Sequence, residues 1–258
     1  MKFDLHVRAG RPEISEFAER LTVLIESQGG SVVDAPEVTP DMVLAVGGDG
    51  TMLGAVYRAV KWDVPVLGFN LGTLGFLTEA EPEDVESVVA RLLSGDYEVN
   101  DRLTVSAKAA GKNVDGVNDV VVEKIDSTRL VNLEVVIDGT TFATYRADGL
   151  IIATPTGSTA YSFSAGGPVI DPTVDALVLT PVAAHSLFDR PIVLPADAEI
   201  TVTVRGDRPV RVNVDKEVLG HIGDGGHVSI GRGSRPARFV TFGTISFPGL
   251  VRDKFGLE

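Results

Sequence analysis

The spacing of apolar and polar residues follows two different patterns along the chain, and the pattern changes near residue 100. In the first hundred residues, the segments Phe3 to Val7, Met42 to Val46 and Val64 to Phe69 have the length and apolar character of strands. Strands that alternate with amphipathic helices predict a parallel sheet covered by helices over residues 1–100. The helical stripes consist of Ile14, Phe17, Ala18, Leu21, Leu24 and Ile25, then Met52, Leu53, Val56, Ala59 and Val60, then Val85, Val88, Val89, Leu92 and Leu93.

After about residue 100 the helical period disappears, and short alternating segments such as "LTVSAKA", "NLEVVID", "GLIIATP" and "EITVTVRG" take over. Turn pairs, notably Asp138-Gly139 and Gly206-Asp207, separate several of these segments. We therefore expect a β-rich, β-sandwich-like domain over residues 101–237. The apolar tail, residues 238–258, is expected to pack back on the first domain.

Composition narrows the class of protein. With 258 residues, 44% of them hydrophobic, the chain can bury a full core, and the absence of cysteine excludes disulfides, thiolate metal sites and a cysteine nucleophile. The net charge of −13 would repel phosphate backbones and anionic lipids, so neither a nucleic acid nor a membrane is an expected partner. No apolar stretch reaches transmembrane length, and we expect a cytoplasmic protein.

The surface charge has two readings. The 36 acidic residues are scattered, and only seven of the 23 basic residues are lysine. This pattern fits an ordinary acidic protein, and it equally resembles the lysine-poor surfaces of proteins from salt-loving organisms. Activity and melting temperature measured against molar potassium chloride would separate the two readings.

The stretch "AVGGDGTML" contains the first candidate site. Gly47, Gly48, Asp49, Gly50 and Thr51 follow an apolar strand and precede a helix, so the turn lies at the carboxyl end of a sheet strand, where α/β sheets bind ligands. Glycines allow close approach, and free N–H groups at a helix start suit phosphate. The carboxylate of Asp49 then has two possible functional roles, taking a proton from an attacking hydroxyl or holding Mg²⁺. The alternative is a tight turn with an Asp helix cap.

A second candidate segment is "RADGLIIATPTGSTAYSFSAGG", residues 146–167, in which hydroxyl-bearing and small residues crowd one turn. Such a turn suits a nucleotide, although a capped short helix ended by Gly166-Gly167 would explain it as well. Asn118-Asp119 interrupts an alternating strand pattern. The pair could grip two ribose hydroxyls, or it could simply form a turn.

The sequence does not support several other kinds of active or binding site. The chain lacks the phosphate-loop, dinucleotide-fingerprint, nucleophile-elbow and zinc-helix motifs. Its four histidines, His6, His185, His221 and His227, show no ligand spacing, so each is interpreted as structural. No metal site built by the protein alone is expected.

The motifs together resemble one family. "GGDGTML", "NLGTLGFLTE" at residues 70–79, "VNDVVV" and "DGLIIATPTGSTAYSFSAGGP" stand in the order and at about the spacing found in the NAD kinases. GGDGT alone is shared with diacylglycerol and sphingoid-base kinases and, more loosely, with phosphofructokinases. The combination is not shared, and the resemblance covers most of the chain.

The resemblance implies a role for each matching residue. It identifies Asp49 as the catalytic aspartate, the general base that deprotonates the 2′-hydroxyl of the adenosine ribose, and Gly50 as a dinucleotide contact beside it. Gly47, Gly48, Gly50 and Thr51 form the phosphate-donor turn. Asn118 and Asp119 match an Asn-Glu or Asn-Asp pair that binds a ribose and the nicotinamide side. The further NAD contacts implied are Phe76, Arg129, Arg146, Asp148, Thr159, Ala160, Tyr161, Ser162 and Ser164, with Phe76 lying against the adenine and Tyr161 providing a ring.

One segment departs from the family. Many members read Asp-Gly-Gln in the late β region, whereas this chain reads Asp215-Lys216-Glu217, so Glu217 is not assigned to the site.

The expected reaction transfers phosphate from ATP or polyphosphate, with Mg²⁺, to NAD, giving NADP. The family also implies a homodimer or homotetramer. Two alternatives stay open, a lipid kinase that shares the GGDGT turn and a catalytically silent NAD(P)-binding sensor.

Overall fold

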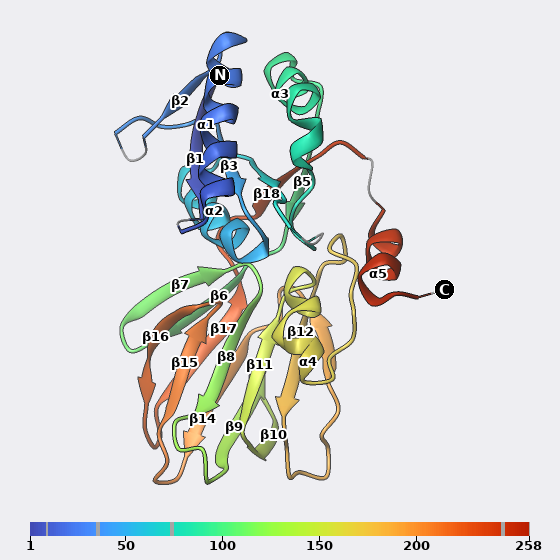
Figure 1. The fold of residues 1–258 in the computed structure, drawn as a ribbon. Helices are drawn as coiled ribbons and strands as arrows, with labels where there is room; N and C mark the ends of the chain where they lie inside the picture. Colours follow the sequence, from blue (N-terminus) through green and yellow to red (C-terminus); the bar gives the residue numbers. More distant parts are fainter. Residues whose placement is uncertain (9, 35–36, 73–74, 244–245, 258) are drawn as a thin grey trace. The chain divides into compact units, whose positions relative to one another are not determined.

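The computed structural model describes every residue except 9, 35–36, 73–74, 244–245 and 258. The described residues divide into two compact units (Figure 1). Met1–Asp101 together with Ala237–Glu258 form the first, here called the α/β unit, and Arg102–Pro236 form the second, the β unit. Parallel strands with helices in the first unit and a β-rich second unit are the fold class that the sequence predicts, and the structure confirms it.

A six-stranded sheet forms the centre of the α/β unit, in the order β2-β1-β3-β4-β18-β5. Strand β1 pairs in parallel with β2 and β3, and β4 pairs in parallel with β3 and β18. All five residues of β3 are buried, which explains their unbroken apolar run. The strands are β1 (Lys2–Val7), β2 (Ser31–Val33), β3 (Met42–Val46), β4 (Val66–Phe69), β5 (Glu98–Arg102) and β18 (Ala237–Thr241).

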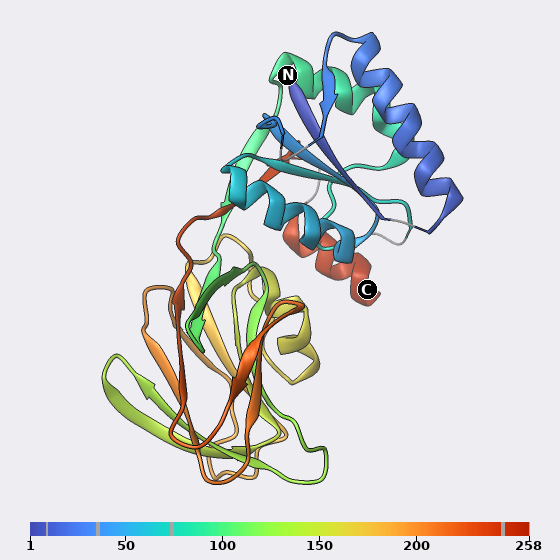
Figure 2. The ribbon, with the colours of Figure 1, turned by 90° about the vertical axis from the view of Figure 1, so that its left-hand side faces the viewer.

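Helices cover both faces of this sheet (Figure 2). Since side chains alternate between the faces of a strand, Met42, Leu44 and Val46 of β3 share one apolar cluster with α1 and α3. Helix α2 covers the opposite face, where a Cβ on Gly68 of β4 would meet the sulfur of Met52 at 2.9 Å. The helices are α1 (Pro12–Ser27), α2 (Asp49–Trp62), the 3-10 helix η1 (Pro82–Asp84), α3 (Val85–Ser94) and α5 (Phe247–Phe255).

The last segment of the chain belongs to the α/β unit. Strand β18 lies between β4 and β5, and its Phe239 pairs with Val66. Helix α5 follows, and its first turn is capped by Ser246, whose hydroxyl accepts the N–H of Gly249 at 3.3 Å. Within the described part of the chain, no helix combines the length and apolarity needed to cross a bilayer.

Two six-stranded antiparallel sheets make up the β unit. The β9 sheet has the order β10-β9-β14-β17-β6-β7, and the β8 sheet has the order β13-β12-β11-β8-β15-β16 (Figure 1). The strands are β6 (Val105–Ala109), β7 (Lys112–Gly116), β8 (Asp119–Lys124), β9 (Val131–Ile137), β10 (Thr140–Ala147), β11 (Gly149–Ala153), β12 (Ala176–Val182), β13 (Ile192–Pro195), β14 (Ile200–Arg205), β15 (Val210–Val214), β16 (Glu217–Ile222) and β17 (His227–Arg232).

The core of the β unit lies between these sheets and takes alternate residues of each strand. Val120 and Val122 of β8 join one large cluster with residues of the β9 sheet, such as Val202 of β14. Val121 belongs instead to a small cluster with Ile151 on the outer face. The alternation therefore directs Asp119, like Val121, away from the sandwich core.

The two predicted turn pairs have different roles. Asp138-Gly139 joins β9 to β10, and both residues are left-handed, with φ of 49° and 75°, which is the geometry of a tight hairpin. Gly206-Asp207 instead links β14 in the β9 sheet to β15 in the β8 sheet, so it carries the chain between layers and is not a hairpin.

Candidate functional site

The glycine turn begins directly after β3. Gly47 has φ 150°, and a Cβ there would lie 2.5 Å from Oγ1 of Thr51, so only glycine fits. Gly48 is the N-cap of α2, and its carbonyl accepts the N–H of Thr51 at 2.8 Å. Gly50 is exposed and Asp49 is half-buried. The turn therefore presents bare backbone and one carboxylate at the carboxyl end of β3.

The carboxylate of Asp49 turns away from its own helix. The N–H of Phe76 donates to its Oδ2 at 3.1 Å, and the N–H of Leu77 donates to its Oδ1 at 3.2 Å. Helix α2 has no side-chain cap, so the alternative of an Asp helix cap is wrong. A Cβ on Gly75 would lie 2.0 Å from Oδ1, which shows how closely the second glycine motif encloses the carboxylate.

Phe76 joins this site to the C-terminal helix. Its ring lies 6.2 Å from the ring of Phe255, and the ammonium group of Lys254 lies 5.5 Å from its centre. The ring is half-buried, so part of its surface stays accessible. The sequence predicts that residues 238–258 pack back on the first domain, but it does not identify Phe76 as a partner, because α5 is far from Phe76 along the chain.

In the β unit, the hydroxyl-rich segment folds into two short helices at the end of β11. These are the 3-10 helix η2 (Thr156–Thr159) and α4 (Tyr161–Ser164). Several hydroxyls serve the fold: Ser158 donates to the carbonyl of Pro155 at 2.6 Å, and the Oγ of the fully buried Ser162 lies 2.9 Å from Oγ1 of Thr180. The accessible members of the predicted set are Thr159, Ala160, Tyr161 and Ser164.

Tyr161 is the largest exposed group of this segment, with 43% of its surface accessible. Partial burial of the phenol, followed by the negative charges of Glu123, Asp148 and Asp119, raises its pKa. The hydroxyl therefore stays protonated near neutral pH and can donate a hydrogen bond.

Asn118 and Asp119 lie beside this segment, where β8 begins. The N–H of Thr154 donates to the carbonyl of Asn118 at 2.8 Å, and a Cβ on Gly157 would lie 2.0 Å from the same oxygen. The structure thus brings the Asn-Asp pair and the 154–164 segment together. Burial, followed by the negative charge of Asp215, raises the pKa of Asp119 to about 7.

The remaining predicted residues are Arg129, Arg146 and Asp148, and the charge of Asp148 acts on Tyr161. In the β8–β11 pairing, Ala153 lies opposite Asp119, whereas Gly149, next to Asp148, lies opposite Glu123. Four residues of strand separate these two positions by about 13 Å. Arg146 is exposed, and Asp148 forms an ion pair with Lys124. Arg129 and Lys124 line a cavity of about 280 Å³ at that end.

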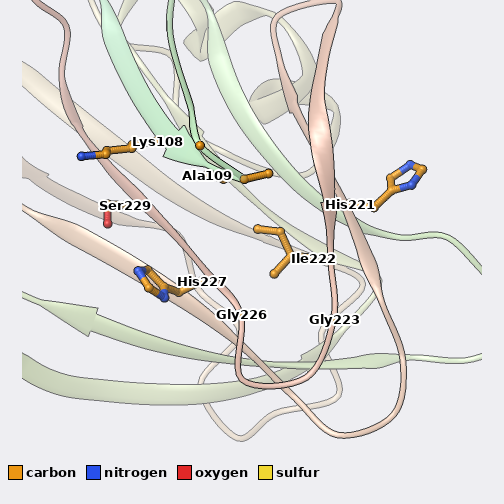
Figure 3. A pocket seen from close by; sticks show the side chains of 10 residues that line it. Lys108, Ala109, His221, Ile222, Gly223, Gly226, His227 and Ser229 are labelled. Carbon is orange, nitrogen blue, oxygen red and sulfur yellow. The ribbon is translucent and has the colours of Figure 1, made fainter.

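A larger cavity of about 560 Å³ holds none of the predicted site residues. It is lined by residues of β6, β16 and β17, including Lys108, His221 and His227 (Figure 3). The ring of His221 points away from that of His227. Among the described residues, no group of three or more His, Cys, Asp or Glu side chains could hold a metal ion.

Comparison with known proteins places both units in one family. A model of the ATP-NAD kinase N-terminal domain matches residues 8–97, and a model of the ATP-NAD kinase C-terminal domain matches residues 117–242. An NAD kinase of Moorella thermoacetica is 38% identical over 250 residues, which cover 92% of this chain and 80% of the relative. An NAD kinase of Geotalea daltonii is 41% identical over 227 residues, which cover 86% of this chain and 80% of the relative.

Solved structures agree with these matches. An NAD kinase from Archaeoglobus fulgidus in complex with ATP gives a TM-score of 0.79 at 26% identity and covers 99% of this chain and 98% of that one. Yeast NADH kinase complexed with NADH gives a TM-score of 0.89 at 23% identity, covers 100% of this chain and 88% of that one, and supports the fold. The chain belongs to the ATP-NAD kinase family of phosphotransferases.

Proposed function

We propose that the chain phosphorylates the 2′-hydroxyl of the adenosine ribose of NAD to give NADP, with ATP or polyphosphate as the donor. The observation that carries the proposal is the carboxylate of Asp49, which two backbone N–H groups hold in a turn of bare backbone. Phosphoryl transfer needs positioned reactants and an oriented nucleophile more than covalent work by the protein. A fixed carboxylate with open space around its turn suits that task.

Asp49 acts as the general base in this proposal and takes the proton of the ribose hydroxyl as the hydroxyl attacks the terminal phosphorus of the donor. Gly47, Gly48, Gly50 and Thr51 form the turn that receives the donor phosphates. Backbone N–H groups and the start of α2 favour negative charge there. This local attraction offsets the repulsion that a chain of net charge −13 exerts on a polyphosphate.

Mg²⁺ fits this arrangement. A carboxylate has about four acceptor positions. Among the described residues, the N–H groups of Phe76 and Leu77 occupy two on Asp49, so oxygen remains for the ion, directly or through water. Bound there and to the donor phosphates, Mg²⁺ would neutralise charge on the transferred group.

The dinucleotide is assigned to the residues that the family resemblance predicts. Asn118 and Asp119 bind a ribose and the nicotinamide side, and residues 159–164 embrace the adenosine, with Tyr161 as a stacking or hydrogen-bonding ring. Phe76 lies against the adenine. The proximity of Asn118 to the 154–164 segment supports this assignment.

Arg129, Arg146 and Asp148 complete the predicted set of NAD contacts. The charge of Asp148 acts on Tyr161, which supports its place in this set. A homodimer or homotetramer remains the assembly that the family implies. A cytoplasmic location stays a prediction.

Asp49→Asn tests the assignment of the base. The substitution keeps the size of the side chain and an acceptor oxygen but removes the basic group, so turnover should fall by roughly 10² to 10⁴ while NAD binding persists. NADP formation measures the first and calorimetry the second. The control is Asp197→Asn, which changes an exposed acid of the β unit and should leave both unchanged.

Normal turnover in Asp49→Asn would refute the role of Asp49 as base. Binding of NAD by the wild-type chain without product, whatever donor is supplied, would identify a silent sensor instead. Turnover on sphingosine or diacylglycerol in preference to NAD would identify a lipid kinase. A panel of ATP, other nucleoside triphosphates and polyphosphate, with NAD and NADH as acceptors, would define the substrates.

A further inference from the structure

The segment from Val117 to Asp119 is held on one side by the carboxylate of a single residue, Asp215. The N–H of Val117 donates to its Oδ2 at 2.9 Å. The N–H groups of Asn118 and Asp119 donate to its Oδ1 at 2.8 and 3.0 Å. In return, the N–H of Asp215 donates to the carbonyl of Asp119 at 2.9 Å. Bonds to a charged acceptor are stronger than neutral ones, so this side chain anchors three consecutive peptide groups.

Thr154 holds the other side of the same segment. Its hydroxyl donates to the carbonyl of Val117 at 2.5 Å, and its N–H donates to the carbonyl of Asn118 at 2.8 Å. With these bonds, every backbone N–H and carbonyl from Val117 to Asp119 has a partner. What the segment can offer to a ligand is therefore its side chains, and those of Asn118 and Asp119 are polar.

The turn between β15 and β16 does not by itself require an acid at position 215. The residue is left-handed, with φ 49°, and asparagine or glycine suits that conformation at least as well. A carboxylate is costly here, because its charge opposes ionisation of Asp119, which is only 5% exposed. Asparagine would avoid this repulsion, but its side chain has only one acceptor oxygen. The three N–H groups donate to both carboxylate oxygens of Asp215. The need to hold the backbone from Val117 to Asp119 therefore explains why an acid stands at position 215.

We propose that Asp215 is a positioning residue for the dinucleotide: by fixing the backbone of Val117 to Asp119, it holds the side chains of Asn118 and Asp119 in the orientation that grips a ribose. This inference rests on the proposed function, in which those two side chains bind NAD. Asp215 acts through its neighbours. Its loss should therefore weaken binding of the dinucleotide and leave binding of the phosphoryl donor unchanged.

Asp215→Asn is the test, because it keeps the volume and the left-handed turn and removes one acceptor oxygen. Asp138→Asn is the matched control. Asp138 also has φ 49° in a hairpin turn, its carboxylate accepts the N–H of Glu199 at 2.8 Å, and its own N–H donates to the carbonyl of Glu199 at 2.9 Å. We expect the Kd of NAD to rise about tenfold or more in Asp215→Asn, the equivalent of losing one to two charge-assisted bonds. The KM of the donor, and both constants in Asp138→Asn, should stay unchanged.

Amide hydrogen exchange reports the anchoring directly, and it should accelerate at residues 117–119 in Asp215→Asn alone. Faster exchange there with an unchanged Kd for NAD would make Asp215 purely structural and overturn the proposal. Equal losses of NAD and donor binding would overturn it too, because they indicate general unfolding. Calorimetry needs no turnover, so a wild-type chain that binds NAD without phosphorylating it refutes the proposed function alone. A wild-type chain that does not bind NAD overturns both.

Discussion

Gly75→Ala should slow the reaction by displacing Asp49. An ideal Cβ at Gly75 would lie 2.0 Å from Oδ1 of Asp49 and 2.9 Å from Oγ1 of Thr78. Ordinary carbon contacts begin near about 3.5 Å, so the carboxylate would have to retreat by about 1.5 Å. Its bonds from the N–H groups of Phe76 and Leu77, at 3.1 and 3.2 Å, would then break. A misplacement of about 1 Å costs on the order of 10²-fold in rate, so we expect kcat to fall by at least that factor.

The assay is the initial rate of NADP formation at saturating NAD and donor, with the melting temperature of each variant measured beside it. Gly72→Ala is the matched control from the same motif, because a Cβ there meets nothing within 4 Å. In an Asp49→Ala background the new methyl group meets no carboxylate, so Gly75→Ala should cost less stability there. A wild-type kcat in Gly75→Ala would refute the claim that the position of Asp49 sets the rate.

Two further predictions concern the β unit. Because burial raises the pKa of Asp119 to about 7, the folded chain keeps a proton that the unfolded chain loses near its ordinary pKa of 3.8. The free energy of unfolding should therefore fall by up to about 4 kcal/mol between about pH 4 and pH 7. Urea titrations at each pH measure this fall, and Asp119→Asn should lack it. The same dependence of unfolding free energy on pH in both proteins would contradict the prediction. Gly157→Ala forces a Cβ to within 2.0 Å of the Asn118 carbonyl and should cost about 1 to 3 kcal/mol, whereas Gly223→Ala, in open space, should cost little.

The sequence predicts local structure in this chain well, because local structure depends on neighbours along the chain. The run Met42 to Val46 is β3, and the helical stripe that follows is the buried face of α2. Asp138-Gly139 forms a hairpin because both residues tolerate positive φ. Gly206-Asp207 has the same composition in reverse, yet it joins two layers. The residue types predict that a turn occurs, but which strands pair on either side of it depends on segments that are distant along the chain.

The spacing of apolar residues does not predict which distant segments contact each other. The apolar tail is expected to return to the first domain, but no periodicity predicts that β18 lies between β4 and β5 or that the ring of Phe255 in α5 contacts Phe76. Asp215 is the clearest case, because its three bonds cross 96 to 98 residues. In the sequence, Asp215 only matches the first residue of the family's Asp-Gly-Gln, and the departure from that pattern lies at Lys216 and Glu217. This match gives no reason for the acid, since the reason is a set of backbone groups that become neighbours on folding.

Asp49 and Asp215 are each oriented by consecutive backbone N–H groups from a distant segment, and the number of those bonds separates their roles. A carboxylate offers about four acceptor positions. Within the described part of the chain, the N–H groups of Phe76 and Leu77 fill two on Asp49, which leaves acceptor positions for the hydroxyl or the cation of the proposed reaction. Asp215 accepts three N–H groups and has little capacity left, so it fits a part in holding structure.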